Sequence, residues 1–348
     1  MKISIRSLGS GSEKNKQTRN NRGYKVQNRI KAAAIQLKAN LGDVASNLKK
    51  VGRLIDKAAS LGANLIIVPE FFTSGVAFHP SLLKVALPLD GLAKDLLVTK
   101  ARKYNAYVGG SFITSRNGDL YNTFVLAMPD GSTRMHDKDQ PTMWENCFYT
   151  GGKDRGILDT PIATIGSVLC WEFVRTRTIH RLLGKVDIVV GGSCWWSVPL
   201  NWPPKGLWAW YHRRNERIMS STPSTFASIL GVPVVHASHA GDLDAYMPMV
   251  PGIPYRSYYL GETQIVDGSG VVLARMTRDD GEGVITADIT PGRRPPSLSC
   301  PERFWIPRLP ILFRAVWSYQ NMHGRWYYKK SKKNGSLYIP TASHGAVD

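Results

Sequence analysis

Short apolar runs alternate with amphipathic segments along the first half of the chain. A run of four to eight apolar residues is typical of a buried strand, whereas apolar positions that recur every three or four residues indicate a helix with one buried face. The pattern predicts these elements in order: strand 32–37, helix 44–61, strand 64–70, helix 81–104 and strand 106–113. The pair Asn117-Gly118 then predicts a tight turn into a hairpin partner over 121–128.

The second half of the chain repeats this alternation. Its pattern predicts these elements in order: strand 162–170, helix 175–183, strand 186–192, helix 206–220 and strand 232–238. A hairpin follows over 262–276, with its turn at Gly268-Ser269-Gly270, and 284–289 is expected to form the last strand. Helices and strands that alternate in this way indicate an α/β domain with layered sheets. We find no fixed-period repeat and no internal linker, which favours a single domain.

The positive charge of the chain lies mostly at its two ends. The formal net charge is +19, of which residues 1–31 contribute +8 and residues 301–348 contribute +6. A basic segment can bind nucleic acid or an anionic membrane surface, and it can equally be a solvated tail. We therefore divide the chain into a basic flexible leader over 1–30, a domain over 31–300 and an aromatic and basic C-terminal tail over 301–348.

Composition and cysteine spacing narrow the class of protein further. With 43% hydrophobic and 20% charged residues, the chain is expected to fold around a sizeable core, which excludes disorder over its whole length. None of the four cysteines forms a CxxC pair, so neither a zinc site nor a disulfide framework is expected. The N-terminus lacks the apolar stretch of a signal peptide, and no apolar run is long enough to cross a membrane. These features predict a cytoplasmic protein.

The C-terminal tail concentrates large apolar and aromatic residues between 304 and 317. Each such side chain stabilises the fold by roughly 1.5–3 kcal/mol when it is fully buried, so we expect contacts to order the tail. Pro307 and Pro310 prevent one continuous amphipathic helix. We expect the tail to pack on the body or on the neighbouring subunit of a homodimer or larger homo-oligomer. The basic run KKSKK (329–333) leaves a peripheral membrane contact as the alternative.

Three reactive residue types stand at strand ends or in the loops just beyond them, namely Glu70, Lys138 and Cys170. Side chains from distant parts of an α/β chain can converge at such positions. A thiolate attacks carbonyl or nitrile carbon, a glutamate can take the thiol proton, and a lysine can stabilise the negative charge that develops. Taken singly, however, these residues are more often a surface acid, a solvated lysine and a small core side chain.

Three sequence blocks carry a family resemblance and supply these residues in order. They are LIIVPEFFTSG (65–75), HDKDQPTMWENCFYTGG (136–152) and DTPIATIGSVLCWEF (159–173). Together they resemble the nitrilase superfamily of carbon–nitrogen hydrolases. A weaker likeness continues through VPVVHASHAG (232–241) and GETQIVDGSGVVLA (261–274), so that the resemblance covers about residues 32–290.

The resemblance implies both a fold and a mechanism. The implied fold is a four-layer αββα sandwich that uses no metal and no other cofactor. The implied activity is hydrolysis of a non-peptide carbon–nitrogen bond in a small-molecule amide or nitrile, with release of ammonia or an amine through a thioester. In that mechanism Glu70 takes the proton of Cys170, and Lys138 acts with the backbone N–H of Trp171 to hold the developing anion. Glu145 would position substrate or water.

A substrate pocket is expected near the segment SCWWSVP (193–199), which follows the strand after the nucleophile. Trp195 and Trp196 could pack an apolar or aromatic substrate, and Trp144 and Phe148 are expected to face the same cavity. The triplet Cys-Trp-Glu at 170–172 is similar to the elbow of true nitrilases, but it does not separate nitrile from amide substrates. Three histidines at 136, 236 and 239 are expected to be structural.

Two other classes of protein stay open at this point. One is a nucleic-acid-binding protein with basic tails, because aromatic and basic residues alternate near 325–333. The other is a catalytically idle scaffold on the same fold that only assembles into oligomers. The presence of Glu70, Lys138 and Cys170 together argues against the scaffold.

Overall fold

The computed structural model describes residues 29–247 and 252–340. The predicted leader over 1–30 therefore lies almost wholly outside the described residues, as do the last positions of the predicted tail, 341–348. None of the helices in the described part of the chain is both long and apolar enough to cross a membrane.

The strands fall into two groups that are joined at one seam. The first group, in spatial order, is β6 (Thr133–Asp137), β5 (Asp119–Ala127), β4 (Tyr107–Arg116), β2 (Leu65–Ile67), β1 (Ile30–Leu37) and β13 (Gly283–Ile289). The second is β7 (Ile157–Asp159), β8 (Thr164–Leu169), β9 (Ile188–Ser193), β10 (Val234–Tyr246), β11 (Pro254–Val266) and β12 (Val272–Thr277). The groups meet where β1 and β10 pair in parallel at Gln36 with Ser238 and Leu37 with His239.

Alternating side chains of each strand separate the core into layers. In β1, Ala33, Ile35 and Leu37 pack with the helices α1 (Val44–Ser60) and α2 (Leu92–Tyr104). Its other apolar residues, Ile30, Ala32 and Ala34, pack instead against the second group of strands. This period of two is what a strand buried on both faces requires.

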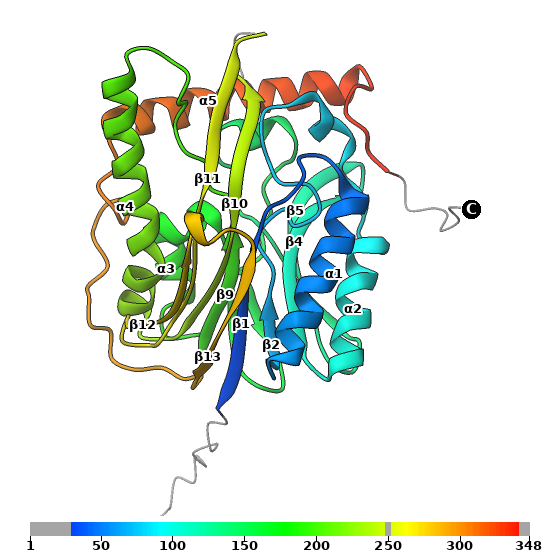
Figure 1. Cartoon of the computed structure of the whole chain (residues 1–348), viewed down its shortest axis with the longest axis vertical. Coiled ribbons are helices and arrows are strands. Elements are labelled where there is room, and N and C mark those ends of the chain that lie inside the picture. Colours follow the sequence, from blue (N-terminus) through cyan, green and yellow to red (C-terminus); the bar gives the residue numbers. More distant parts are fainter. Residues whose placement is uncertain (1–28, 248–251, 341–348) are drawn as a thin grey trace, which may run out of the picture.

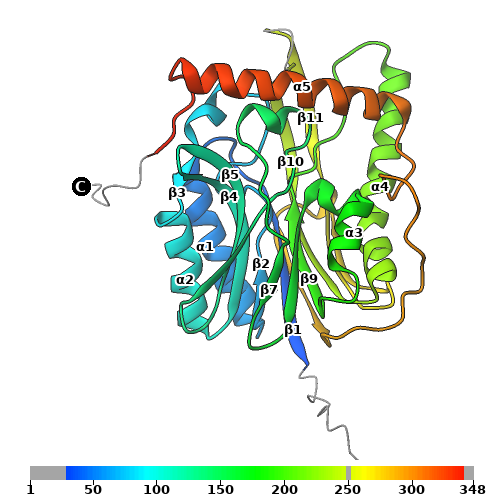
Figure 2. The same ribbon diagram turned by 180° about the vertical axis from the view of Figure 1, so that it is seen from behind.

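The second group of strands has its own helical cover, α3 (Thr176–Leu182) and α4 (Lys205–Leu230). Figures 1 and 2 show α1 and α2 on one side of the strands and α3 and α4 on the other. The predicted αββα sandwich is thereby confirmed.

Most predicted elements are present with shifted ends, but one prediction is wrong. Residues 81–104 do not form one helix. They begin with a short 3₁₀ helix, η1 (Pro80–Lys84), continue through the two-residue strand β3 (Leu87–Pro88) and enter α2 only at Leu92. The physical reason is Pro88, which has no N–H to donate and disfavours a helical conformation in the residue before it.

A helix that the sequence pattern did not predict, α5 (Ile311–Lys333), follows the prolines of the tail. It begins directly after Pro310, so the prolines do interrupt the apolar segment as predicted. Figures 1 and 2 show α5 running across one end of the sandwich. Its buried residues are Phe313, Gln320, Asn321, Gly324, Tyr328 and Ser331, which recur at helical spacing.

The middle of α5 is fastened to a short 3₁₀ helix of the same chain, η2 (Met143–Cys147). Asn321 Oδ1 accepts hydrogen bonds from Met143 N at 3.0 Å and from Asn146 Nδ2 at 2.8 Å. At Gly324 the two backbones approach so closely that an added Cβ would lie 2.5 Å from the Asn146 Cβ and 3.0 Å from its carbonyl carbon. The tail is therefore ordered by contact with its own domain.

Replacing Gly324 by alanine should lower the melting temperature, although alanine is the better helix former by about 1 kcal/mol. The added methyl group meets backbone atoms of η2 that cannot move aside, and overpacking of this kind costs about 1–3 kcal/mol. Thermal unfolding followed by circular dichroism measures the effect. Ser318→Ala, at an exposed position of the same helix, is the control. A Gly324→Ala protein that melts at or above the wild-type temperature would contradict the close contact.

Candidate active site

Four buried side chains from separate elements meet at one point. Glu70 follows β2, Lys138 follows β6, Glu145 lies in η2 and Cys170 follows β8. Lys138 Nζ donates to Glu70 Oε1 at 2.8 Å and to Glu145 Oε2 at 2.6 Å. A carboxylate oxygen of each glutamate and the Cys170 Sγ all lie within 4.8 Å of one another. The structure thus brings together the three residues predicted to be catalytic and the predicted supporting Glu145.

The carboxylate of Glu70 is held by donors from three directions. Beside Lys138, Oε1 accepts from Asn122 Nδ2 at 2.8 Å, and Oε2 accepts from the backbone N–H of Cys194 at 3.0 Å. The backbone carbonyl of Glu70 accepts from His239 Nε2 at 2.6 Å. Burial lowers the pKa of His239 to about 4, so this ring is neutral and serves as a structural donor. A carboxylate fixed in this way keeps its orientation without reorganisation when it exchanges a proton.

The charges at the site set the proton affinities of its members. Burial raises the pKa of Glu70, Lys138 lowers it and Glu145 raises it again, which leaves it at about 7. Burial alone would lower the pKa of Lys138, but Glu145 and Glu70 hold it well above its usual value, so the ammonium stays charged. Burial and the Glu70 charge raise the pKa of Cys170 well above its ordinary value despite Lys138. The resting cysteine is therefore a thiol that needs a base, and Glu70 titrates in the range where a base is effective.

Only one of the two carboxylate oxygens of Glu145 accepts hydrogen bonds from the described residues. Its Oε2 accepts from Lys138, from the backbone N–H of Thr142 at 2.9 Å and from the hydroxyl of Tyr149. Its Oε1 is buried and has no hydrogen-bond partner among the described residues. A buried acceptor left in this state is costly, so this oxygen is available to bind a water or a polar group of a ligand.

Cys170 sits at a sharp turn from strand to helix. It adopts a φ of +49°, the left-handed region that side chains other than glycine rarely occupy, and it starts the 3₁₀ helix η3 (Cys170–Val174). Glu172 stabilises the turn, because its Oε2 accepts from the backbone N–H of Leu169 at 2.8 Å. Trp171 lies in the first turn of η3, where backbone N–H groups have no partner within the helix.

A second charged cluster supports this turn from behind. Glu172 contacts His136 Nε2 at 3.0 Å and Arg181 Nη2 at 3.3 Å, while His136 Nδ1 contacts Asp154 Oδ1 at 2.6 Å. Burial alone would lower the pKa of His136, but the charge of Glu172 and the hydrogen bond that the ring donates to Asp154 raise it to about 9. His136 is therefore a charged structural residue. Through Glu172, it stabilises the turn between β8 and η3 that contains Cys170.

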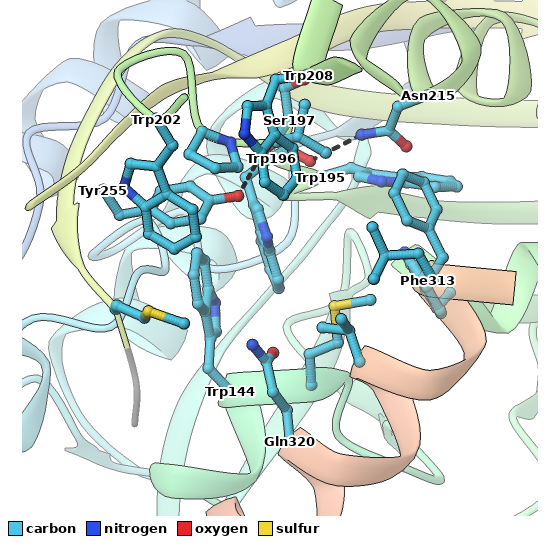
Figure 3. A pocket seen from close by; sticks show the side chains of 17 residues that line it. Trp144, Trp195, Trp196, Ser197, Trp202, Trp208, Asn215, Tyr255, Phe313 and Gln320 are labelled. Atoms are coloured by element: carbon cyan, nitrogen blue, oxygen red, sulfur yellow. Dashed lines mark hydrogen bonds between the residues drawn. The ribbon is translucent and has the colours of Figure 1, made fainter. Parts of the chain in front are cut away.

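A cavity of about 150 Å³ is lined in part by Trp144 and Trp171, the sequence neighbours of Glu145 and Cys170 (Figure 3). Trp144, Trp195 and Trp196 line it, at the positions expected for pocket residues. Phe148 does not line it, because its ring packs instead against Phe78, with the ring centres 6.3 Å apart. A role of the three tryptophans in substrate binding stays a prediction.

The sequence pattern missed two polar residues that complete the site, Asn122 and Tyr149. Asn122 lies within the apolar run of β5, where a buried amide needs a partner, and this is the signal that could have drawn attention to it. Tyr149 gives no such signal, because an aromatic residue in an apolar segment is equally suited to simple packing.

The site also contains atoms that could coordinate a cation. Within the described residues, Glu70, Glu145 and Cys170 bring ligand atoms close enough together to share one ion. The ammonium of Lys138, however, donates to both carboxylates and already supplies a positive charge between them. The charge balance of the two carboxylates thus depends on a residue of the chain itself.

Comparison with known proteins places these features in a wider group. The family described as carbon–nitrogen hydrolase matches residues 31–294. An aliphatic nitrilase of Rhodococcus rhodochrous is 30% identical over 175 residues, which is 44% of this chain and 47% of that protein. A cyanide hydratase of Armillaria gallica is 26% identical over 283 residues, which is 75% of this chain and 77% of that protein.

The fold has close counterparts among solved structures as well. The crystal structure of a carbon–nitrogen hydrolase from Helicobacter pylori superposes with a TM-score of 0.63 over 75% of this chain and 89% of that one, at 18% identity. This likeness concerns the fold alone, whereas the family match spans the segments that contain Glu70, Lys138, Glu145 and Cys170. The chain therefore belongs to the carbon–nitrogen hydrolase family.

Proposed function

We propose that this protein hydrolyses a non-peptide carbon–nitrogen bond in a small-molecule amide or nitrile, with Cys170 as the nucleophile. The observation that carries the proposal is the buried arrangement in which a charged Lys138 bridges Glu70 and Glu145 beside the Cys170 thiol. The match reaches only 47% of the Rhodococcus nitrilase, so the activity of that relative is support for the proposal and no more.

In the first step Glu70 accepts the proton of the Cys170 thiol as sulfur adds to the carbon of the substrate. A carbon–sulfur bond forms, and the electron pair of the C=O or C≡N bond moves onto its oxygen or nitrogen. Lys138 and the backbone N–H of Trp171 stabilise this developing anion, which is the largest electrostatic demand of such reactions. Glu70 then returns the proton to the nitrogen of the substrate.

In the second step the nitrogen leaves and water restores the enzyme. An amide loses ammonia or an amine directly to give a thioester with Cys170. A nitrile first gives a thioimidate, which takes up one water molecule and then loses ammonia to give the same thioester. A water molecule then attacks the thioester while Glu70 takes one of its protons. Glu70 returns this proton to the sulfur as the carboxylic acid departs and the thiol re-forms. The free Oε1 of Glu145 is suited to position this water.

The proposal extends to location and assembly. All four cysteines are free in the structure, and a thiol nucleophile stays reduced in the cytoplasm, which we infer to be the location. We also propose that the chain forms a homodimer or larger homo-oligomer. Exposed apolar side chains on α4 and α5 support this, among them Leu207 with 47% of its surface exposed, Trp210 with 45% and Trp326 with 54%.

Loss of the Cys170 sulfur should abolish turnover. We expect Cys170→Ala to reduce ammonia release from amides and nitriles by at least about 1,000-fold, because the covalent step is lost. Melting curves check that the variant stays folded. The control is Cys300→Ala, which removes a thiol outside the site and should leave most of the activity. Comparable ammonia release by wild type and Cys170→Ala would show that Cys170 is not the nucleophile. No release by the wild type would leave the protein as a scaffold without this chemistry.

The pH dependence of the reaction should report the ionisation of Glu70. Because its pKa is raised to about 7 and the base must be ionised, kcat/KM should fall as the pH drops below about 7. Glu70→Gln should lose this activity at every pH, while Glu216→Gln on the surface of α4 keeps the wild-type profile. A wild-type profile that stays flat from pH 5.5 to 8, with the fold intact, contradicts the assignment of Glu70 as the base.

The molar mass of the protein in solution tests the proposed homo-oligomer. Multi-angle light scattering of the full chain should give at least twice the 38.6 kDa of one subunit, and the value should hold on dilution to micromolar concentration. A mass near 38.6 kDa at every concentration would show that the exposed apolar side chains do not mediate self-association.

A further inference from the structure

The cavity beside the site is aromatic to an unusual degree. Six of the ten tryptophans of the chain line it, and none of its lining residues is charged. The six are Trp144, Trp171, Trp195, Trp196, Trp202 and Trp208. The remaining wall includes Phe313, Val316 and Gln320 of α5. An ionic group would have to give up its hydration there without a counter-charge, so the cavity disfavours charged ligands.

Three buried polar atoms of this wall have no hydrogen-bond partner among the described residues. They are Trp144 Nε1, a donor, and Asn215 Oδ1 and Gln320 Oε1, two acceptors. Asn215 already donates through Nδ2 to the carbonyl of Trp196 at 3.2 Å, which leaves its oxygen to accept. Gln320 is 8% exposed, and Figure 3 shows its amide pointing from α5 into the cavity. A buried polar atom without a hydrogen-bond partner lowers the stability of the fold, so these three atoms point to a ligand that forms hydrogen bonds with them.

The volume of the cavity limits the size of that ligand. An apolar cavity of about 150 Å³ accommodates one benzene molecule, and this cavity has about 150 Å³. Its aromatic walls offer faces and edges, as in the stacked pair Trp144 and Trp196 with centres 4.3 Å apart and the perpendicular pair Trp144 and Tyr255 at 5.2 Å. Aromatic rings bind best to such surfaces in offset or edge-on contact.

Three of the tryptophans that line the cavity adjoin residues of the site along the chain. Trp144, Trp171 and Trp195 line it, and each is the direct sequence neighbour of a residue at the site, namely Glu145, Cys170 and Cys194 respectively. Cys170 itself is not part of the wall. A group bound in the cavity must therefore carry its carbon–nitrogen group on a portion that extends beyond the aromatic wall toward the sulfur.

We propose that the acyl part of the substrate is an uncharged aromatic ring that bears a hydroxyl or ring N–H group, with Gln320 of α5 as a specificity-determining residue. This rests on the proposed function, because it names the substrate class of the same site. The ring packs on the tryptophans, its O–H or N–H donates to Gln320 Oε1 or Asn215 Oδ1, and a hydroxyl oxygen can accept from Trp144 Nε1. The C-terminal helix thereby selects the substrate from outside the catalytic cluster.

Equilibrium binding to the otherwise intact Cys170→Ala chain tests this proposal without turnover. Isothermal titration calorimetry would compare 4-hydroxyphenylacetamide with phenylacetamide, cyclohexylacetamide and 4-carboxyphenylacetamide. We expect the hydroxyl compound to bind about 5–10-fold more tightly than phenylacetamide, because two buried partners become satisfied. Cyclohexylacetamide should bind several-fold more weakly than phenylacetamide, and the carboxylate at least about 100-fold more weakly than the hydroxyl compound.

Substitutions of Gln320 test whether α5 causes the preference for the hydroxyl compound. In the Cys170→Ala background, Gln320→Leu should weaken the binding of the hydroxyl compound about 5–10-fold more than the binding of phenylacetamide, so that the advantage of the hydroxyl group is lost. Gln320→Met is the second variant if the leucine disturbs folding. Met322→Leu, at an exposed position of the same helix, is the control and should change neither affinity. Equal loss of both affinities in the two Gln320 variants would overturn the assigned role.

The outcomes separate this inference from the function on which it rests. If wild-type protein releases ammonia from acetamide or propionitrile as readily as from the aromatic compounds, the inference fails and the function stands. If the aromatic compounds bind in the expected order but no amide or nitrile releases ammonia, the inferred ligand preference of the cavity is supported and the proposed hydrolase function is contradicted. Absence of binding by all four amides, or equal affinity for them, also overturns the inference.

Discussion

The ammonium of Lys138 is the charge around which this site is built. A fully buried ammonium is stable only when opposite charges and hydrogen bonds replace its hydration, a requirement of several kcal/mol. Glu70 and Glu145 meet that requirement at 2.8 and 2.6 Å, and each is held in turn by backbone N–H donors. Since three separate segments must deliver these side chains to one buried point, the position of the strand ends is a condition for a stable fold as well as for chemistry.

The same requirement, that buried charges are paired, explains why two separate clusters of charged side chains lie around Cys170. In front of the sulfur, one lysine faces two carboxylates, and the pKa of Glu70 rises to about 7. Behind it, Glu172 faces His136 and Arg181, and the pKa of Glu172 is held well below its usual value although burial would raise it. The front cluster can exchange a proton near neutral pH, whereas the rear cluster keeps its charges and holds the backbone turn.

The C-terminal helix links the outer layer of the protein to this centre. Through Asn321 it fixes η2, the segment that contains Glu145, and through Gln320 it reaches the wall of the aromatic cavity. Gly324 permits this contact, because a side chain there would meet the backbone of η2. Adjacent residues of α5, Gln320 and Asn321, thus contact the wall of the aromatic cavity and η2, so that a helix outside the sandwich is packed against both.

The sequence by itself determined the alternation of strands and helices and the residues that stand at the strand ends, because burial on one or both faces leaves a periodic pattern. Family-like blocks then identified Glu70, Lys138, Glu145 and Cys170. Only the tertiary structure decided which other groups complete the site. The hydrogen bonds of Asn321 join residues 178 and 175 positions apart, and Phe148 turned toward Phe78 instead of the cavity. Periodicity records that a side chain is buried, but the neighbour that covers it is set by packing between segments distant in the chain.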